Sequence, residues 1–144
     1  QANPLDDTVH GIEAKLAYGW EAGSVELAAA WLDKDPDYGT ATVDASYYVL
    51  NYSEWRIQAR WEQSVTERLS FNLRADWQRR ADNPLRATGN EGLFLDAGLR
   101  YQPFDNDRLV LRLEGRNLGD EDLQEFPGTP TPKREGRLIV EVRW

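Results

Sequence analysis

The stretch Leu69-Ser70-Phe71-Asn72-Leu73-Arg74-Ala75-Asp76-Trp77 alternates strictly between apolar and polar residues. Successive side chains of a β-strand point to opposite faces of its sheet, so this period of two predicts a strand with one apolar and one polar face. The same pattern recurs in six other segments. With Gly115 as the one exception, the in-phase positions of all seven segments are apolar: Ile12, Ala14, Leu16, Tyr18, Trp20; Val25, Leu27, Ala29, Trp31; Trp55, Ile57, Ala59, Trp61; Leu69, Phe71, Leu73, Ala75, Trp77; Leu93, Leu95, Ala97, Leu99, Tyr101; Leu109, Leu111, Leu113, Gly115; Leu138, Val140, Val142, Trp144.

No segment has a convincing period of 3.6 residues, so the sequence predicts an all-β fold in a single domain over residues 1–144. The connections are short at 21–24, 64–68 and 103–108, and long at about 33–53, 79–92 and 117–136. Short and long connections alternate along the chain. We therefore expect an antiparallel, up-and-down sheet with tight turns at one end and large loops at the other, as in outer-membrane barrels.

The number of strands depends on residues 43–54. Val43, Ala45, Tyr47 and Val49 are in phase with the apolar row that begins at Trp55, so they could extend that strand and give seven strands. Alternatively, residues 51–54 form a turn and separate an eighth strand. The alternation of loop lengths favours one long strand.

Charged residues of both signs occupy many of the polar positions. If the apolar face contacts lipid in a transmembrane barrel, the charges that face the lumen are Glu13, Arg56, Arg60, Glu62, Arg74, Asp76, Asp96, Arg100, Arg112, Glu114, Arg116, Glu141 and Arg143. In a soluble barrel or sandwich, the apolar rows would instead point inward and these charges would be solvated.

Three features favour the apolar face outward. The apolar rows are nearly unbroken, whereas soluble edge strands usually carry a charge or a proline. Alanine, which fills a core poorly, is frequent in them. Aromatic residues end five rows, where interfacial girdles lie in membrane barrels. The girdle residues are Trp20, Trp31, Trp77, Tyr101 and Trp144.

The composition excludes several classes of function. The net charge of −8 argues against a nucleic-acid partner. The chain has no cysteine and one histidine, so thiolate metal sites and multi-histidine sites are excluded. No serine has the context of a nucleophile elbow and no carboxylate pair stands out, so we do not expect an enzyme. No apolar run is long enough for a transmembrane helix.

The last segments resemble the end of TonB-dependent outer-membrane receptors. In these receptors an Asn-Leu-Phe-Asp element leads into the last outer loop, and a Pro-Gly-Arg element opens the last strand. The matching residues are Asn117, Leu118, Asp120, Gly136 and Arg137, whereas Gly119 replaces the Phe and Glu135 replaces the Pro. Upstream, residues 10–23 resemble the Gly-(Val/Ile)-Glu strand of the family, and residues 93–103 resemble the strand before the penultimate hairpin. The final strand resembles the β-signal read by the barrel-assembly machinery, through Leu138, Val140, Val142 and Trp144.

The resemblance implies a transport component in the outer membrane of a Gram-negative bacterium, in contact with outer-membrane lipid. It covers nearly the whole chain but only the C-terminal third of such a receptor, which closes about 22 strands around an N-terminal plug. We therefore expect either a fragment or a chain completed by a second chain that carries the plug and the remaining strands. The alternatives are a small stand-alone barrel with a structural or anchoring role and, less favoured, a soluble ligand-binding barrel.

The long loops are the expected place for substrate contacts, because aromatic side chains there can stack on a ligand. The candidates are Tyr38, Tyr47, Tyr48, Tyr52 and Phe126. Carboxylates that could offer hard oxygen ligands to Ca²⁺ occur in two groups, Asp33, Asp35 and Asp37, and Asp120, Glu121 and Asp122. The first group lacks the glycine and the distal glutamate of an EF-hand loop, so we predict no metal site and no cofactor.

Overall fold

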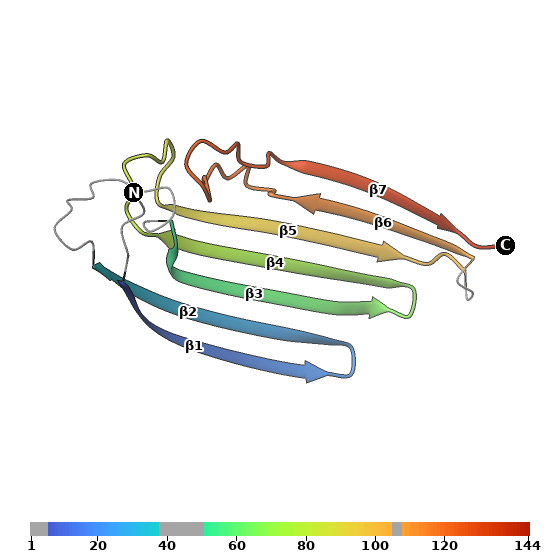
Figure 1. Cartoon of the computed structure of the whole chain (residues 1–144). Coiled ribbons are helices and arrows are strands. Elements are labelled where there is room, and N and C mark those ends of the chain that lie inside the picture. Colours follow the sequence, from blue (N-terminus) through green and yellow to red (C-terminus); the bar gives the residue numbers. More distant parts are fainter. Residues whose placement is uncertain (1–5, 38–50, 105–107) are drawn as a thin grey trace.

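The computed structural model describes residues 6–37, 51–104 and 108–144, which form one antiparallel sheet (Figure 1). Its strands are β1 (Asp6–Trp20), β2 (Gly23–Asp37), β3 (Ser53–Thr66), β4 (Leu69–Arg80), β5 (Glu91–Tyr101), β6 (Leu109–Arg116) and β7 (Glu135–Val142). The strands lie in chain order across the sheet, and every neighbouring pair is antiparallel. The predictions of an all-β fold and of up-and-down topology are confirmed. In these described ranges, no helix is long and apolar enough to cross a membrane.

The sheet is open. Figure 1 shows a curved layer with β1 at one edge and β7 at the other, and within the described residues these two strands do not pair with each other. A barrel closes only when its first and last strands are joined by hydrogen bonds. The described strands of this chain therefore form a wall and do not form a closed barrel.

The pairing register keeps the two faces of the sheet separate. Apolar residues meet apolar residues from strand to strand, as in the row Ile57, Trp77 and Leu93. Further along the sheet, Leu113 of β6 lies opposite Leu138 of β7. Most of these side chains are exposed to the surroundings of the isolated sheet, and the buried apolar residues of the described chain are only Ala81, Val110 and Leu123. The sheet thus carries one continuous apolar face that nothing in the described chain covers.

Aromatic side chains lie towards both ends of this apolar face. Near the long loops, the rings of Trp31 and Trp55 are 6.3 Å apart across the β2–β3 pair. Towards the short turns, Trp61 and Phe71 make an edge-to-face contact at 4.9 Å. The expected girdle residues Trp20, Trp31, Trp77 and Tyr101 lie in the strands, whereas Trp144 lies beyond the end of β7 and is fully exposed.

The register is regular except at the two ends of the β3–β4 pair. One irregularity lies between Ser53 and Trp55, and the other lies between Ser64 and Thr66. Between them, each residue of β3 faces its partner on β4 without a shift. Both irregularities are therefore outside the central part of the apolar face.

The strands are longer than the apolar rows, so the predicted loop limits were too wide. β2 continues to Asp37 rather than ending near residue 33. The second long connection spans 81–90 rather than 79–92, and the third spans 117–134 rather than 117–136. Arg143 lies past the last residue of β7. The hydrogen bonds between strands join backbone groups and do not depend on side-chain polarity. The strands therefore continue into polar segments, where an alternating pattern of apolar residues gives no signal.

The prediction of one unbroken strand from Val43 to Trp61 was wrong at residues 51 and 52. β3 begins at Ser53, and Asn51 and Tyr52 lie outside it. The carbonyl of Tyr52 accepts a hydrogen bond from the backbone N–H of Ala81 (3.0 Å). This contact ties the segment to the end of β4. Residues 43–49 lie outside the described part of the chain.

Candidate functional site

The connection between β6 and β7 folds back over the polar face of the sheet and encloses a pocket of about 640 Å³, here named the loop-end pocket. Strands β3 to β6 supply its polar floor, with Arg56, Arg74, Asp76, Gln78, Asp96 and Arg116, together with the apolar Phe94. The connection supplies the other wall, with Asn117, Leu123, Glu125, Phe126, Thr129, Pro130, Thr131, Pro132 and Lys133, and Glu135 completes the lining. The lining thus combines a smaller number of apolar residues, among them Phe94, Leu123 and Phe126, with many polar and charged side chains.

Asn117 fixes the start of the fold-back. Its backbone is in the left-handed region (φ 45°), which asparagine tolerates better than most residues. The side-chain amide donates to the carbonyls of Glu121 (2.9 Å) and Pro132 (2.7 Å), and its Oδ1 accepts from the N–H of Glu121 (2.8 Å). Its own N–H donates to Asp96 Oδ1 (2.9 Å). One buried side chain therefore joins the first turn of the connection to its last part.

Two further contacts hold the middle of the connection against the sheet. Leu123 is fully buried and packs on Gly92, where an added Cβ would lie 2.9 Å from the Leu123 Cβ. Only glycine allows this close approach. The neighbouring Gln124 exchanges hydrogen bonds with the connection between β4 and β5, through Thr88 Oγ1 and the N–H of Ala87 (2.9 Å each). The pocket wall is therefore anchored at several points.

We expect Asn117→Ala to lower the free energy of unfolding by about 2 kcal/mol, because buried backbone groups lose their partners and alanine disfavours a positive φ. Urea unfolding followed by tryptophan fluorescence measures the change. Asn117→Gly is the matched control, since it removes the same hydrogen bonds and keeps the backbone conformation. It should be about 1 kcal/mol less destabilising than alanine. If Asn117→Ala unfolds at the same urea concentration as the wild type, this side chain does not hold the connection between β6 and β7 in place.

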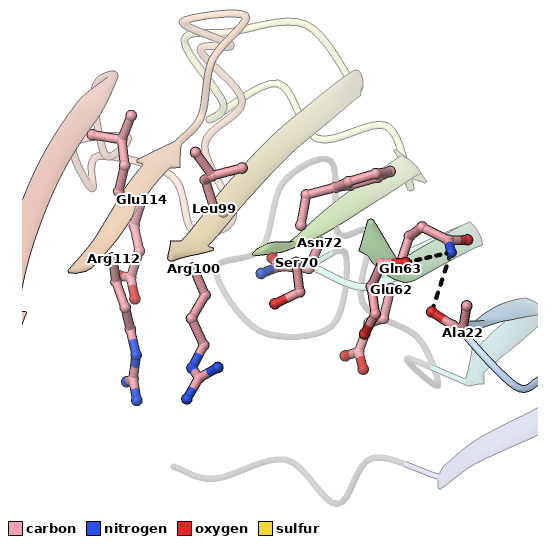
Figure 2. Close-up of a pocket in the computed structure, with 13 residues that line it drawn as sticks. Ala22, Glu62, Gln63, Ser70, Asn72, Leu99, Arg100, Arg112 and Glu114 are labelled. Carbon is pink, nitrogen blue, oxygen red and sulfur yellow. Dashed lines mark hydrogen bonds between the residues drawn. The ribbon is translucent and has the colours of Figure 1, made fainter. Parts of the chain in front are cut away.

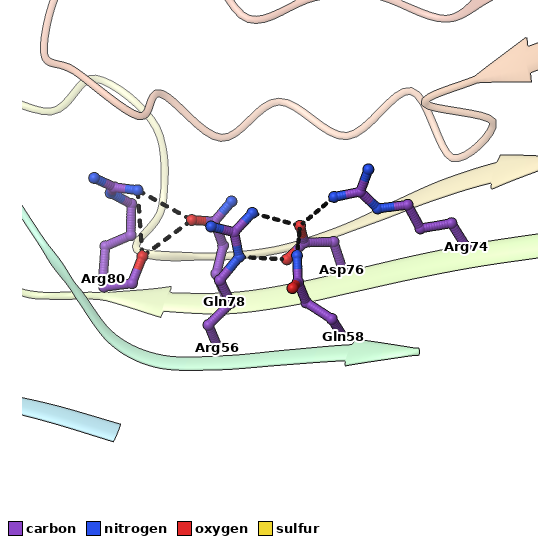
Figure 3. A network of polar contacts seen from close by, with 7 residues as sticks. Arg56, Gln58, Arg74, Asp76, Gln78 and Arg80 are labelled. Carbon is purple, nitrogen blue, oxygen red and sulfur yellow. Dashed lines mark hydrogen bonds and ion pairs between the residues drawn. The ribbon is translucent and has the colours of Figure 1, made fainter. Parts of the chain in front are cut away.

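The floor of the pocket is a polar network centred on Asp76, which is only 7% exposed. Arg56 donates two hydrogen bonds to its carboxylate, at 3.0 and 2.6 Å, and Gln58 Nε2 donates a third at 2.8 Å. Arg74 Nη2 lies 3.6 Å from the same carboxylate. Figure 3 shows Arg56, Gln58 and Arg74 converging on Asp76 from two neighbouring strands. One carboxylate thus contacts two guanidinium groups.

The predicted ligand-contact aromatics have different positions. Phe126 is half-exposed and lines the loop-end pocket. Tyr52 is outside the pocket lining, and its ring lies under Lys34 Nζ, 5.5 Å from the ring centroid. Tyr38, Tyr47 and Tyr48 lie outside the described residues.

The charges predicted to face a lumen all come from the polar face, but only some of them are paired. Arg56 pairs with Asp76 (2.6 Å), and Arg112 pairs with Glu141 (3.1 Å). Figure 2 shows Arg100 and Arg112 extending from the same side of the sheet as Glu62. Among these predicted charges, the side chains without a hydrogen bond or ion pair in the described structure are Glu13, Arg60, Glu62, Glu114, Arg116 and Arg143.

Four of these unpaired charges gather round a smaller hollow of about 260 Å³ in the middle of the polar face: Arg60, Glu62, Glu114 and Arg116. Its base includes Gly98, and the Asn72 side chain lies across this glycine. A Cβ at position 98 would be 2.6 Å from Asn72 Nδ2, so a larger residue there would require the Asn72 side chain to move. The hollow offers two cations and two anions for contacts with another molecule.

The described side chains of the two acidic groups considered as Ca²⁺ ligands are not brought together in one place. Asp120 Oδ1 accepts from the N–H of Arg134 (3.0 Å), Glu121 accepts from the N–H of Leu93 (3.2 Å), and Asp122 pairs with Lys133 (3.6 Å). The side chain of Asp37 lies outside the described part of the structure. Within the described ranges, no three acidic, histidine or cysteine side chains come together as metal ligands would.

Sequence reasoning named several residues of the pocket lining, but it did not single out Phe94, Gln78 or the glycine at position 92. Phe94 and Gly92 occupy polar-face positions of β5, and an apolar residue or a glycine on that face is a sign that something covers the sheet there. Gln78, Arg80 and Arg86 carried no signal that distinguished them from other polar residues. Comparisons of the chain with protein-family models, with curated proteins and with solved structures found no match.

Proposed function

We propose that this chain is a wall of a transmembrane β-barrel in the outer membrane of a Gram-negative bacterium. In this proposal it is the C-terminal part of a TonB-dependent-receptor-like protein that contributes to substrate uptake. A second chain, or the rest of a longer protein, supplies the plug and the remaining strands. No catalytic role is assigned to it.

The observation that carries the proposal is the uncovered apolar face. It runs without interruption across seven strands, and aromatic side chains lie towards both of its ends. The apolar rows at 12–20, 69–77 and 93–101 are nine residues long, close to the length with which a tilted strand crosses the hydrocarbon core. Lipid covers such a face without requiring a second protein layer.

The edges and the polar face support a wall that is completed by other strands. Within the described chain, β1 and β7 each have one edge without a partner strand, and such edges favour pairing with further strands. The unpaired charges around Gly98 would meet a plug, as the resemblance to TonB-dependent receptors implies. The loop-end pocket lies on the same side and would contribute Phe126 to substrate binding.

The proposal is tested by extracting the chain from its native membrane in detergent, measuring the native mass of the particle and identifying every polypeptide in it. We expect a particle with a plug and about fifteen further strands, on the same or another chain. A bare 16.5 kDa species that is rich in strands and modified by heat would favour a small stand-alone barrel. A chain that stays in solution without detergent would favour a soluble ligand-binding barrel, with the apolar face inside. Either of these last two outcomes would refute the transport proposal.

A further inference from the structure

Two buried arginines lie beyond the network of Asp76, and one of them, Arg80, contacts Gln78 of the loop-end pocket. Arg80 ends β4 and is 8% exposed, and Arg86, in the following connection, is 7% exposed. Guanidinium groups remain protonated in proteins, so both side chains carry a full positive charge. Buried charges are ordinarily paired with an opposite charge, because an unpaired buried charge is costly.

The partners of both guanidinium groups are neutral. Arg80 donates to Gln78 Oε1 (3.0 Å) and Ser53 Oγ (3.4 Å). Arg86 donates to the carbonyl of Ala81 (3.0 Å) and to Asn90 Oδ1. In the described residues, no carboxylate oxygen lies within 4.0 Å of either group. The Nε–H groups of both arginines are buried and have no acceptor.

The side chain of Asn51 contacts both guanidinium groups. Its Oδ1 lies 3.4 Å from Arg80 Nη2 and 3.5 Å from Arg86 Nη2, so one amide oxygen is shared by two cations at long distances. The Asn51 amide nitrogen is also buried without a partner. The nearest carboxylates act only at longer range, Glu125 on Arg80 and Asp82 on Arg86. Burial lowers the pKa of Arg86, and Asp82 offsets this only in part.

We propose that Arg80, Arg86 and Asn51 form a binding site for an oxyanion, the phosphate or carboxylate group of a small solute. The anion takes the place of the Asn51 amide as the shared acceptor and neutralises two buried charges that the described chain leaves unpaired. Charge-assisted hydrogen bonds from two guanidinium forks match the geometry of a carboxylate or a phosphate. The site goes beyond the proposed transport role and does not need it, because anion binding can be measured whether or not the sheet belongs to a transporter.

The test compares inorganic phosphate, acetate and chloride at equal ionic strength, with the purified chain and any chain that accompanies it. Thermal unfolding is followed by tryptophan fluorescence. We expect phosphate or acetate to raise the midpoint by several degrees relative to chloride, because a ligand of the folded state stabilises it. The anion that raises the midpoint more is the preferred oxyanion. Equal midpoints in all three salts would overturn the proposal.

Asn51→Asp provides the sharpest variant, since it places a carboxylate at the shared position without changing the shape of the side chain. In chloride its midpoint should rise by a few degrees above that of the wild type, and the response to phosphate and acetate should be lost. A lower midpoint in chloride, or an undiminished response, would contradict the proposal.

Two arginine variants complete the test. Arg86→Gln should lose the response to phosphate and acetate even if it alters the basal midpoint. Arg79→Gln is the matched control, because Arg79 is the neighbouring residue on β4, is half-exposed and pairs loosely with Glu54 and Glu91 (3.6 and 3.7 Å). It should keep the full response. A response that is lost equally in both arginine variants would show that the anions act through general charge rather than through this site.

Discussion

Asp76→Ala should lower the free energy of unfolding by about 3 kcal/mol. The substitution leaves Arg56 and Arg74 without their common carboxylate and leaves Gln58 without an acceptor. Breaking a buried ion pair by removal of one partner costs about 3–5 kcal/mol. Arg56 is 44% exposed, so solvent screens part of the loss and the lower end of that range applies. Urea unfolding in detergent micelles measures the change.

The matched control for Asp76→Ala is Glu26→Ala. Glu26 also pairs with a cation across neighbouring strands of the same face, but both Glu26 and Lys15 are exposed. Its loss should cost about 1 kcal/mol or less. If the two variants lose the same free energy, the network around Asp76 does not stabilise the floor of the loop-end pocket.

Ala59→Arg should be the most damaging single change on the apolar face, with a loss of about 2–4 kcal/mol in lipid. Ala59 lies midway along β3, between Leu27 on β2 and Ala75 on β4, with the aromatic residues Trp55 and Trp61 of the same face on either side of it along the strand. A charge placed there cannot reach the interface as easily as one near the strand ends. Unfolding of the protein in lipid vesicles measures the loss.

Ala28→Arg introduces the same side chain on the opposite face of the sheet. Ala28 lies on β2 directly opposite Gln58, the neighbour of Ala59, and close to Glu26. There the new guanidinium remains in a polar, open region, so the expected change is within about 1 kcal/mol. Equal losses for the two arginine variants would show that the faces do not differ in polarity and would remove the main support for contact with lipid.

The fold could be predicted from the sequence because alternation records the two faces of a strand directly. Each apolar row, such as that from Leu69 to Trp77, lies in a strand, and its residues lie on one face of the sheet. The strand ends could not be predicted, since the ladder between Asp6 and Asp37 joins polar residues through their backbones. The break at Asn51 and Tyr52 was missed for a related reason, because it depends on partners at the end of β4.

The candidate site was predictable only in part. The polar face and Phe126 were identified, because a period of two and an aromatic loop residue are visible locally. The pocket itself depends on a fold-back of 117–134, which is fixed by contacts such as that of Leu123 on Gly92, far apart in sequence. The buried environment of Arg80 and Arg86 likewise arises from tertiary packing, which composition and periodicity do not record.

The regular register between Trp55 and Ser64, with irregularities only at its two ends, restricts how this chain can change length over evolutionary time. Insertion or deletion of a single residue inside that stretch would turn every following side chain of β3 to the opposite face, placing Trp61 among charges and Glu62 among apolar residues. At the ends of the stretch, a bulge absorbs an odd residue without this inversion. Related sequences can therefore gain or lose single residues at the strand ends and in the loops. Within the apolar face, a change in length that keeps the side chains on their own faces must involve two residues at a time.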